Sequence, residues 1–137
     1  MRVVLDTNVL LVCISVRSRL HWIFRALLNA EFTLCVTTEI LAEYAEIIAQ
    51  EMGQITSESV LGVLENLPNV VFITTYYRFN LLADEDDNKF VDCAIAANAD
   101  FIVSHDRDFS VLRRIEFPKV VVISSDQFRP FVQSKST

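Results

Sequence analysis

Four acidic residues of this sequence have the types and positions of a metal-binding site: Asp6, Glu43, Asp92 and Asp106. Asp6 comes directly after the apolar run VVL, and Asp106 closely follows the apolar run FIV. A buried charge without a partner is unfavourable by several kcal/mol, and carboxylate oxygens held together select hard divalent ions such as Mg²⁺ or Mn²⁺. Such an ion activates a bound water, so these residues predict phosphodiester hydrolysis without a Ser, Cys or His nucleophile.

The elements that would position these acids alternate along the chain. Short apolar runs are typical of buried strands, and the segments between them have a helical period. Strands that alternate with helices form right-handed crossovers, so we predict an α/β fold, a three-layer α/β/α sandwich with a parallel sheet of about five strands. The expected strands are 3–5, 33–36, 70–73, 101–103 and 120–123, and the expected helices are roughly 19–30, 38–51, 57–66, 88–99 and a short piece near 109–115.

This topology predicts that the four acids meet at one edge of the sheet. Ligands of open α/β sheets bind at the carboxyl ends of the strands. Asp6 and Asp106 lie at such ends, whereas Glu43 and Asp92 fall in the first turns of helices that follow other strands. Those turns open onto the same edge, so we expect the four carboxylates to converge there.

Glu43 is distinguished from the neighbouring glutamates by its place on the expected helix 38–51. The apolar residues of this helix form one stripe when they are projected at about 100° per residue. Glu46 projects opposite the stripe and Glu39 nearly so, whereas Glu43 lies about 100° from its centre. We therefore expect Glu39 and Glu46 in solvent and Glu43 at the boundary with the core, either as a site residue or as an ordinary solvated acid.

Asp92 interrupts an otherwise apolar helical segment, FVDCAIAA. A helix that is apolar on all sides is buried, so Asp92 is either a metal ligand or a neutral or salt-bridged core residue. The acidic run DEDD at 84–87 predicts a helix N-cap with favourable first-turn charges instead. Asp108 either caps the turn after Asp106 or adds a further metal ligand.

Short polar residues stand beside two of these acids. Thr7, Asn8 and Ser104 are placed to orient the carboxylates or their waters. Thr7 and Asn8 could equally cap the segment that follows them. His105 is expected to be a loop residue that faces solvent or phosphate rather than a metal ligand.

Length and composition predict one domain over residues 1–137, with a frayed tail after about residue 131. Cys13, Cys35 and Cys93 are widely spaced among apolar neighbours, which predicts buried reduced thiols rather than disulfides or a zinc site. The apolar runs are far shorter than the ~20 residues of a membrane span, and the first residues lack the layout of a signal peptide. A cytoplasmic protein is therefore expected.

The surface is expected to be acidic and partly covered. Apolar residues make up 52% of the chain and the mean hydropathy is +0.35, which is high for a small domain and predicts a homodimer or higher homo-oligomer. The net charge of −6 excludes a globally basic surface but not a local basic rim. The candidates for phosphate contacts are Arg17, Arg19, Arg25, Arg78, Lys89 and Arg107. The candidates for base stacking, with core or dimer packing as the alternative, are Trp22, Phe24, Tyr76 and Tyr77.

Four segments together resemble the PIN domain: LDTNVLL, TTEILAEYAEII, DDNKFVDCAIAANADFIVSHDRDF and VVVISSDQF. The likeness is to the bacterial branch of toxins from toxin-antitoxin pairs, akin to VapC-type ribonucleases. It extends from Met1 to about Phe128. The motif DTN alone would be weak, but the series in this order and spacing is specific.

The resemblance implies dependence on Mg²⁺ or Mn²⁺, endonucleolytic cleavage of single-stranded RNA, an antitoxin partner and a homodimer. The acidic quartet of the family falls on Asp6, Glu43, Asp92 and Asp106, with Asp108 as a fifth member. The hydroxyl near the last acids falls on Ser104, where Thr is commoner. The stretch VCISVRSRLHWIFRALL departs from the family because it lacks a small-residue and Pro-rich turn before the first helix.

Two other functions fit parts of this pattern. A phosphatase with an aspartyl nucleophile at Asp6 would need a second Asp two residues later, where this chain has Asn8. A PIN-fold protein that binds protein or RNA without turnover would keep the acids as an inherited feature. We expect the metal-dependent endoribonuclease, and the non-catalytic binding module is the alternative.

Overall fold

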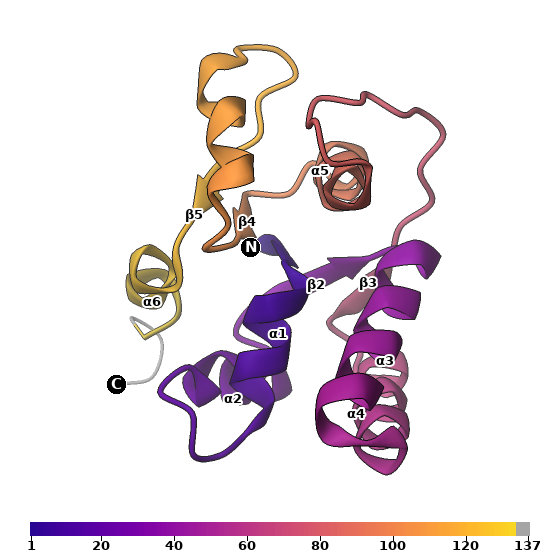
Figure 1. Ribbon diagram of the computed structural model, residues 1–137. Coiled ribbons are helices and arrows are strands. Elements are labelled where there is room, and N and C mark those ends of the chain that lie inside the picture. The colour runs from indigo at the N-terminus through magenta and orange to yellow at the C-terminus, as the bar shows by residue number, and fades with distance from the viewer. Residues whose placement is uncertain (134–137) are drawn as a thin grey trace.

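Five parallel strands form one sheet in the computed structural model, which describes residues 1–133 (Figure 1). The strand order is β3-β2-β1-β4-β5, so β1 is central and the order reverses between β1 and β4. Ligands of open α/β sheets bind outside the strand ends at such a reversal. The strands are β1 (Arg2–Leu5), β2 (Thr33–Val36), β3 (Val70–Phe72), β4 (Phe101–Val103) and β5 (Val122–Ile123).

Helices cover both faces of the sheet, as a three-layer sandwich requires (Figure 1). The crossovers that contain α1 to α4 run outward from β1 toward β3, whereas those with α5 and η1 run toward β5. Right-handed crossovers in opposite directions place their helices on opposite faces. The helices are α1 (Thr7–Ile14), α2 (His21–Leu28), α3 (Thr38–Met52), α4 (Gln54–Asn66), α5 (Glu85–Ala97), the 3₁₀ helix η1 (Arg107–Arg114) and α6 (Ser125–Gln133).

The helices that matter for the site begin at recognisable caps. Thr37 precedes α3, and its side chain accepts a hydrogen bond from the backbone N–H of Ile40 at 3.2 Å. Asp84 precedes α5 and accepts from the N–H of Asp86 at 2.9 Å. Such caps satisfy backbone donors that a helix start leaves free. Asn98 then ends α5 in the left-handed conformation, with φ of 51°.

The core lies on both faces of the sheet, and the central strands are buried completely. Val3, Val4 and Leu5 of β1 have no exposed surface. The three cysteines are free and buried, as predicted, and burial raises the pKa of the Cys13 and Cys93 thiols to about 12. These thiols therefore serve as packing groups.

Most predicted elements are present, and the differences lie at their ends. The sequence did not predict α1 or α6, and β5 is two residues shorter than expected. Helix α5 begins at Glu85 rather than near residue 88, a difference that changes the site. Helix α6 reaches Gln133, and the rest of the predicted frayed tail lies outside the described residues. Among residues 1–133, the structure contains no helix that is both long and apolar enough to cross a membrane.

Candidate metal centre

Asp6 lies at the carboxyl end of β1, where the strand passes directly into α1. Its backbone N–H still bonds to the Val103 carbonyl of β4 at 3.1 Å, and its side chain is only 6% exposed. Asp6 is the N-cap residue of α1, but its side chain makes no capping hydrogen bond. The carboxylate is instead available at the helix start, where the backbone N–H groups favour negative charge.

Ser104 joins the ends of β1 and β4. Its hydroxyl donates to Asp6 Oδ2 at 2.7 Å and accepts from the backbone N–H of Asp106 at 3.0 Å. This buried hydroxyl therefore fixes one Asp6 oxygen and the backbone that carries Asp106. The placement agrees with the orienting role expected for Ser104.

Glu43 reaches the same edge from α3 and is half-buried, as its helical position predicted, whereas Glu39 and Glu46 are exposed. The Thr7 hydroxyl donates a short hydrogen bond to Glu43 Oε2. Lys89 of α5 donates to Glu43 Oε1 with a distance of 2.7 Å. Glu43 is therefore held between the start of α1 and the start of α5.

Asp106 begins the 3₁₀ helix that follows β4. It is the N-cap residue, and its Oδ1 accepts from the backbone N–H of Asp108 at 2.9 Å. Asp106 thus provides the cap, which leaves the Asp108 carboxylate free to point elsewhere. The cap role considered for Asp108 therefore belongs to Asp106.

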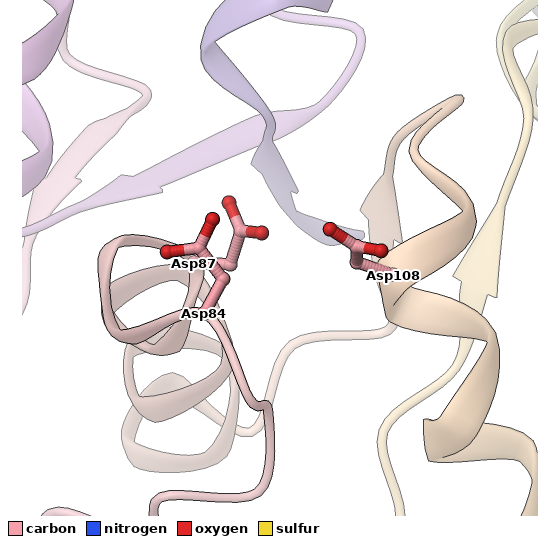
Figure 2. Close-up of side chains that lie close together, drawn as sticks. All are labelled: Asp84, Asp87 and Asp108. Atoms are coloured by element: carbon pink, nitrogen blue, oxygen red, sulfur yellow. The ribbon is translucent and has the colours of Figure 1, made fainter.

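Asp108 points toward two acids at the start of α5, Asp84 and Asp87 (Figure 2). One carboxylate oxygen from each of these three residues lies within 4.8 Å of the others. Burial is the largest cause that raises the pKa of Asp87, to about 6, and the charges of Asp84, Asp106, Asp6 and Asp108 follow. Asp87 is therefore in the electrostatic field of all the acids at this edge.

We call these six residues the acidic cluster: Asp6, Glu43, Asp84, Asp87, Asp106 and Asp108. Burial raises the pKa of Asp6, the hydrogen bond from Ser104 lowers it, and the charges of Asp106 and Glu43 raise it further. Like charges at this density disfavour ionisation unless a cation compensates. The donor set consists of oxygens, which fits a hard divalent ion such as Mg²⁺ or Mn²⁺.

Asp92 does not join the acidic cluster, and this part of the predicted convergence is wrong. Its Oδ1 accepts from the backbone N–H of Phe79 at 3.1 Å. Burial raises its pKa, the hydrogen bond from Phe79 and the charge of Arg78 lower it, and Glu39 raises it. Asp92 instead lines a cleft with Thr37, Arg78 and other residues.

Helical geometry explains why Asp87 and not Asp92 faces the cluster. Five residues of α-helix turn through about 500°, which leaves the two side chains about 140° apart and ~7.5 Å apart along the axis. The signal that could have identified Asp87 is its spacing from Asp84, because residues three apart lie on the same face of a helix. Asp84 is the N-cap as predicted, but the acidic run also contributes two carboxylates to the site.

The remaining predicted residues lie at different distances from this edge. Asn8 is exposed in α1, and Arg17 and Arg19 are exposed in the turn between α1 and α2. Arg107 is exposed beside Asp106. His105 bonds through Nε2 to the Ser125 hydroxyl at 2.9 Å and accepts from the Ser125 backbone N–H at 3.1 Å, so it holds the start of α6.

The aromatic residues considered for stacking divide into two groups. Trp22 packs against Phe128 with ring centroids 5.9 Å apart, which is a structural contact. Tyr76 and Tyr77 are 84% and 75% exposed, in the segment between β3 and α5. Their exposure excludes core packing, so base stacking and dimer packing are the two remaining alternatives.

The sequence matches the family model described as PIN domain over residues 2–108. This match covers most of the chain. The parallel sheet of the chain and the acidic cluster at the sheet edge agree with membership of this family. The chain belongs to the PIN domain family. A search of the curated proteins gives no significant match.

Solved structures with the same fold come from VapBC complexes. A chain in the crystal structure of VapBC2 from Rickettsia felis bound to a promoter DNA fragment superposes with a TM-score of 0.64 and 18% identity, covering 90% of this chain and 98% of that one. A chain of DNA-bound VapBC from Salmonella typhimurium gives a TM-score of 0.58 and 16% identity, covering 91% of this chain and 98% of that one. At these identities the similarity establishes the PIN-like α/β fold.

Proposed function

We propose that this chain is a Mg²⁺- or Mn²⁺-dependent endoribonuclease that cleaves single-stranded RNA. The observation that carries the proposal is the acidic cluster, in which carboxylates from β1, α3, α5 and η1 gather at the sheet edge. Membership of the PIN domain family supports nuclease chemistry at this edge.

The roles of the side chains follow from their contacts. The carboxylates of Asp6, Asp87, Asp106 and Asp108 would hold the ion, and Glu43 and Asp84 border it. A divalent ion at such a site lowers the pKa of an attacking water and stabilises charge on the phosphate. Ser104 orients the Asp6 carboxylate, and Thr7 orients Glu43. Lys89 and Arg107 border the cluster and can attract RNA phosphates.

We further propose that the nuclease is the toxin of a toxin-antitoxin pair, acts in the cytoplasm and forms homodimers. The structural neighbours belong to VapBC complexes, in which the PIN-fold chain is assembled with its antitoxin. The surface offers large apolar side chains for such contacts: Val16 is 79% exposed, Ile55 83% and Phe117 92%. Exposed apolar groups of this size are typical of interaction surfaces when they gather into patches.

The decisive experiment is cleavage of a single-stranded RNA by the purified chain with Mg²⁺, Mn²⁺ or EDTA. Cleavage is expected with either ion and not with EDTA. The Asp6→Asn variant should be inactive while its circular dichroism is unchanged. Cleavage that persists in EDTA, or in Asp6→Asn, would contradict the proposal, and Mn²⁺ binding without cleavage would favour the non-catalytic binding module.

A further inference from the structure

A polar cleft lies beside the acidic cluster, and the metal chemistry does not use it. It has a volume of about 180 Å³ and lies between the start of α3, the segment that links β3 to α5, and the first turns of α5. All the side chains that line it are polar or charged, and we call it the α5 cleft: Thr37, Glu39, Thr75, Arg78, Asn80, Glu85, Asn88, Lys89 and Asp92.

The charges of the α5 cleft differ from those of the acidic cluster. Glu39, Glu85 and Asp92 are balanced in large part by Arg78 and Lys89. A site for a divalent ion or for a phosphate would have one dominant sign. Balanced donors and acceptors fit an uncharged polar ligand with both kinds of hydrogen-bonding group, and a nucleobase edge has this character.

Asp92 is the most constrained acid of the cleft. It is 8% exposed, and its Oδ1 accepts from the N–H of Phe79. Within residues 1–133 no hydrogen bond is donated to Asp92 Oδ2, which therefore keeps its capacity as an acceptor. The side-chain amide of Asn88 is engaged, because its oxygen and its nitrogen each make a hydrogen bond with the backbone of Leu82.

A carboxylate that accepts hydrogen bonds discriminates between the four RNA bases. Guanine alone has two adjacent donors on its pairing edge, N1–H and N2–H, beside acceptors at O6 and N7 that an arginine can meet. Adenine, cytosine and uracil each place an acceptor next to their pairing-edge donor. Asp92 and Arg78 both line the cleft, and together they match the guanine pattern.

Aromatic residues border the cleft on the same segment. Tyr76 and Tyr77 are exposed between Thr75 and Arg78, two residues that line the cleft. An exposed aromatic ring stacks on unpaired bases of single-stranded RNA. Lys89 lines the cleft and also bonds to Glu43 at 2.7 Å, so the cleft adjoins the acidic cluster at this residue.

We infer that the α5 cleft binds a guanine base of the RNA next to the phosphate that the acidic cluster cleaves, with the two oxygens of the Asp92 carboxylate accepting from guanine N1–H and N2–H. This inference rests on the proposed nuclease function. Asp92 is then a specificity-determining residue, and the nuclease cuts at a fixed position relative to guanine. The competing explanation is that Asp92 only anchors the segment before α5 through Phe79.

The test compares two single-stranded RNAs that differ by one amino group. One contains a single guanine in a background of A, C and U, and the other contains inosine there, which lacks the N2 amino group. Loss of one hydrogen bond to a charged acceptor should lower kcat/KM about tenfold to 100-fold for the wild type. In Asp92→Asn, whose amide oxygen can still accept from Phe79 N–H, the two RNAs should be cleaved equally.

The controls separate this inference from the proposed function. Asp86→Asn removes an exposed charge from the first turn of α5, outside the lining of the cleft, and should keep the ratio between guanine and inosine. A purely anchoring Asp92 would lower both rates and leave that ratio unchanged, which would overturn the inference, as would a wild-type ratio near one. Binding of 5′-GMP, 5′-IMP and 5′-AMP without divalent ion tests the cleft independently: preferential GMP binding without RNA cleavage would retain the cleft and reject the nuclease.

Discussion

Helix α5 presents two aspartates to two different environments. Asp87 faces the acidic cluster, where burial and then the charges of four further carboxylates raise its pKa. Asp92 faces the α5 cleft, where burial also raises its pKa, although the N–H of Phe79 and the charge of Arg78 oppose this increase. Asp92 is the more buried of the two, yet Asp87 has the surroundings of a metal ligand. The surrounding charges separate the two roles, because those around Asp87 are all negative and those around Asp92 are of both signs.

The comparison is tested most strongly by the matched variants Asp87→Asn and Asp92→Asn, which remove the same charge from the same helix. Loss of a metal ligand removes several kcal/mol of transition-state stabilisation, so Asp87→Asn should lower kcat about 10³-fold. It should also weaken Mn²⁺ binding measured by calorimetry. Asp92→Asn should bind Mn²⁺ as the wild type does.

The two variants also give the result that would reverse the assignment. If Asp92→Asn loses Mn²⁺ binding and Asp87→Asn keeps it, Asp92 is the ligand and α5 must be rotated relative to the sheet. Circular dichroism and thermal unfolding of both variants exclude a folding defect as the cause.

A smaller effect is expected at the hydroxyl that orients Asp6. Ser104→Ala removes the donor to Asp6 Oδ2 and the acceptor for Asp106 N–H. Partners of metal ligands typically contribute about 10- to 100-fold in metal affinity or activity. Ser104→Thr keeps the hydroxyl and should retain the wild-type Mn²⁺ affinity. Equal losses in both variants would show that packing around β4, and not the hydrogen bond, is important here.

The sequence predicted the fold and most of the site edge because these depend on strong local patterns. The uniform apolar runs of β1, β2 and β4 predict buried strands. The acids that follow β1 and β4 must therefore lie at strand ends. Asp92 was misplaced because its selection relied on burial within an apolar helix. Burial is equally compatible with a loop anchor such as the bond to Phe79, a contact that only tertiary structure reveals.

Helix α5 also shows why the start of an element is hard to predict. The acidic run gave Asp84 its cap role correctly, but the cap places Asp87 in the first turn rather than before the helix. The angle between the two aspartates is fixed by their spacing on one helix. Which of them faces the sheet edge depends on how the helix packs against the sheet, and local sequence does not fix this.

Lys89 provides the cation that touches the acidic cluster, and its removal should have a moderate effect. The side chains of Lys89 and Glu43 are 16% and 23% exposed, so their attraction is only partly screened. Lys89→Met keeps the length of the side chain and should lower the free energy of unfolding by about 1 kcal/mol without divalent ion. Apparent Mn²⁺ affinity should rise severalfold because Glu43 no longer has a competing partner.

The matched control for Lys89 is Arg78→Met. Arg78 pairs with Glu39 at 3.6 Å, but both side chains are exposed. Exposed pairs contribute little to stability, so this variant should unfold like the wild type in urea. Equal destabilisation by both variants would indicate that the partly buried Lys89–Glu43 pair contributes no more to stability than the exposed Arg78–Glu39 pair.

The smallest expected effect is the pH dependence that Asp87 introduces into stability without divalent ion. Folding raises the pKa of this carboxyl from 3.8 to about 6, so the folded state binds more protons in that interval. Stability therefore falls as pH rises from about 4 to about 6, and Asp87→Asn should remove this contribution. The variant and the wild type should have similar urea midpoints near pH 4, and the variant should be more stable near pH 7.

The control for this prediction is Asp86→Asn, which changes an exposed acid in the same turn. A difference in urea midpoint between Asp87→Asn and the wild type that does not change with pH would show that the Asp87 pKa is not raised. Mn²⁺ should stabilise the wild type and not Asp87→Asn, because an ion that binds only the folded state shifts the equilibrium toward it.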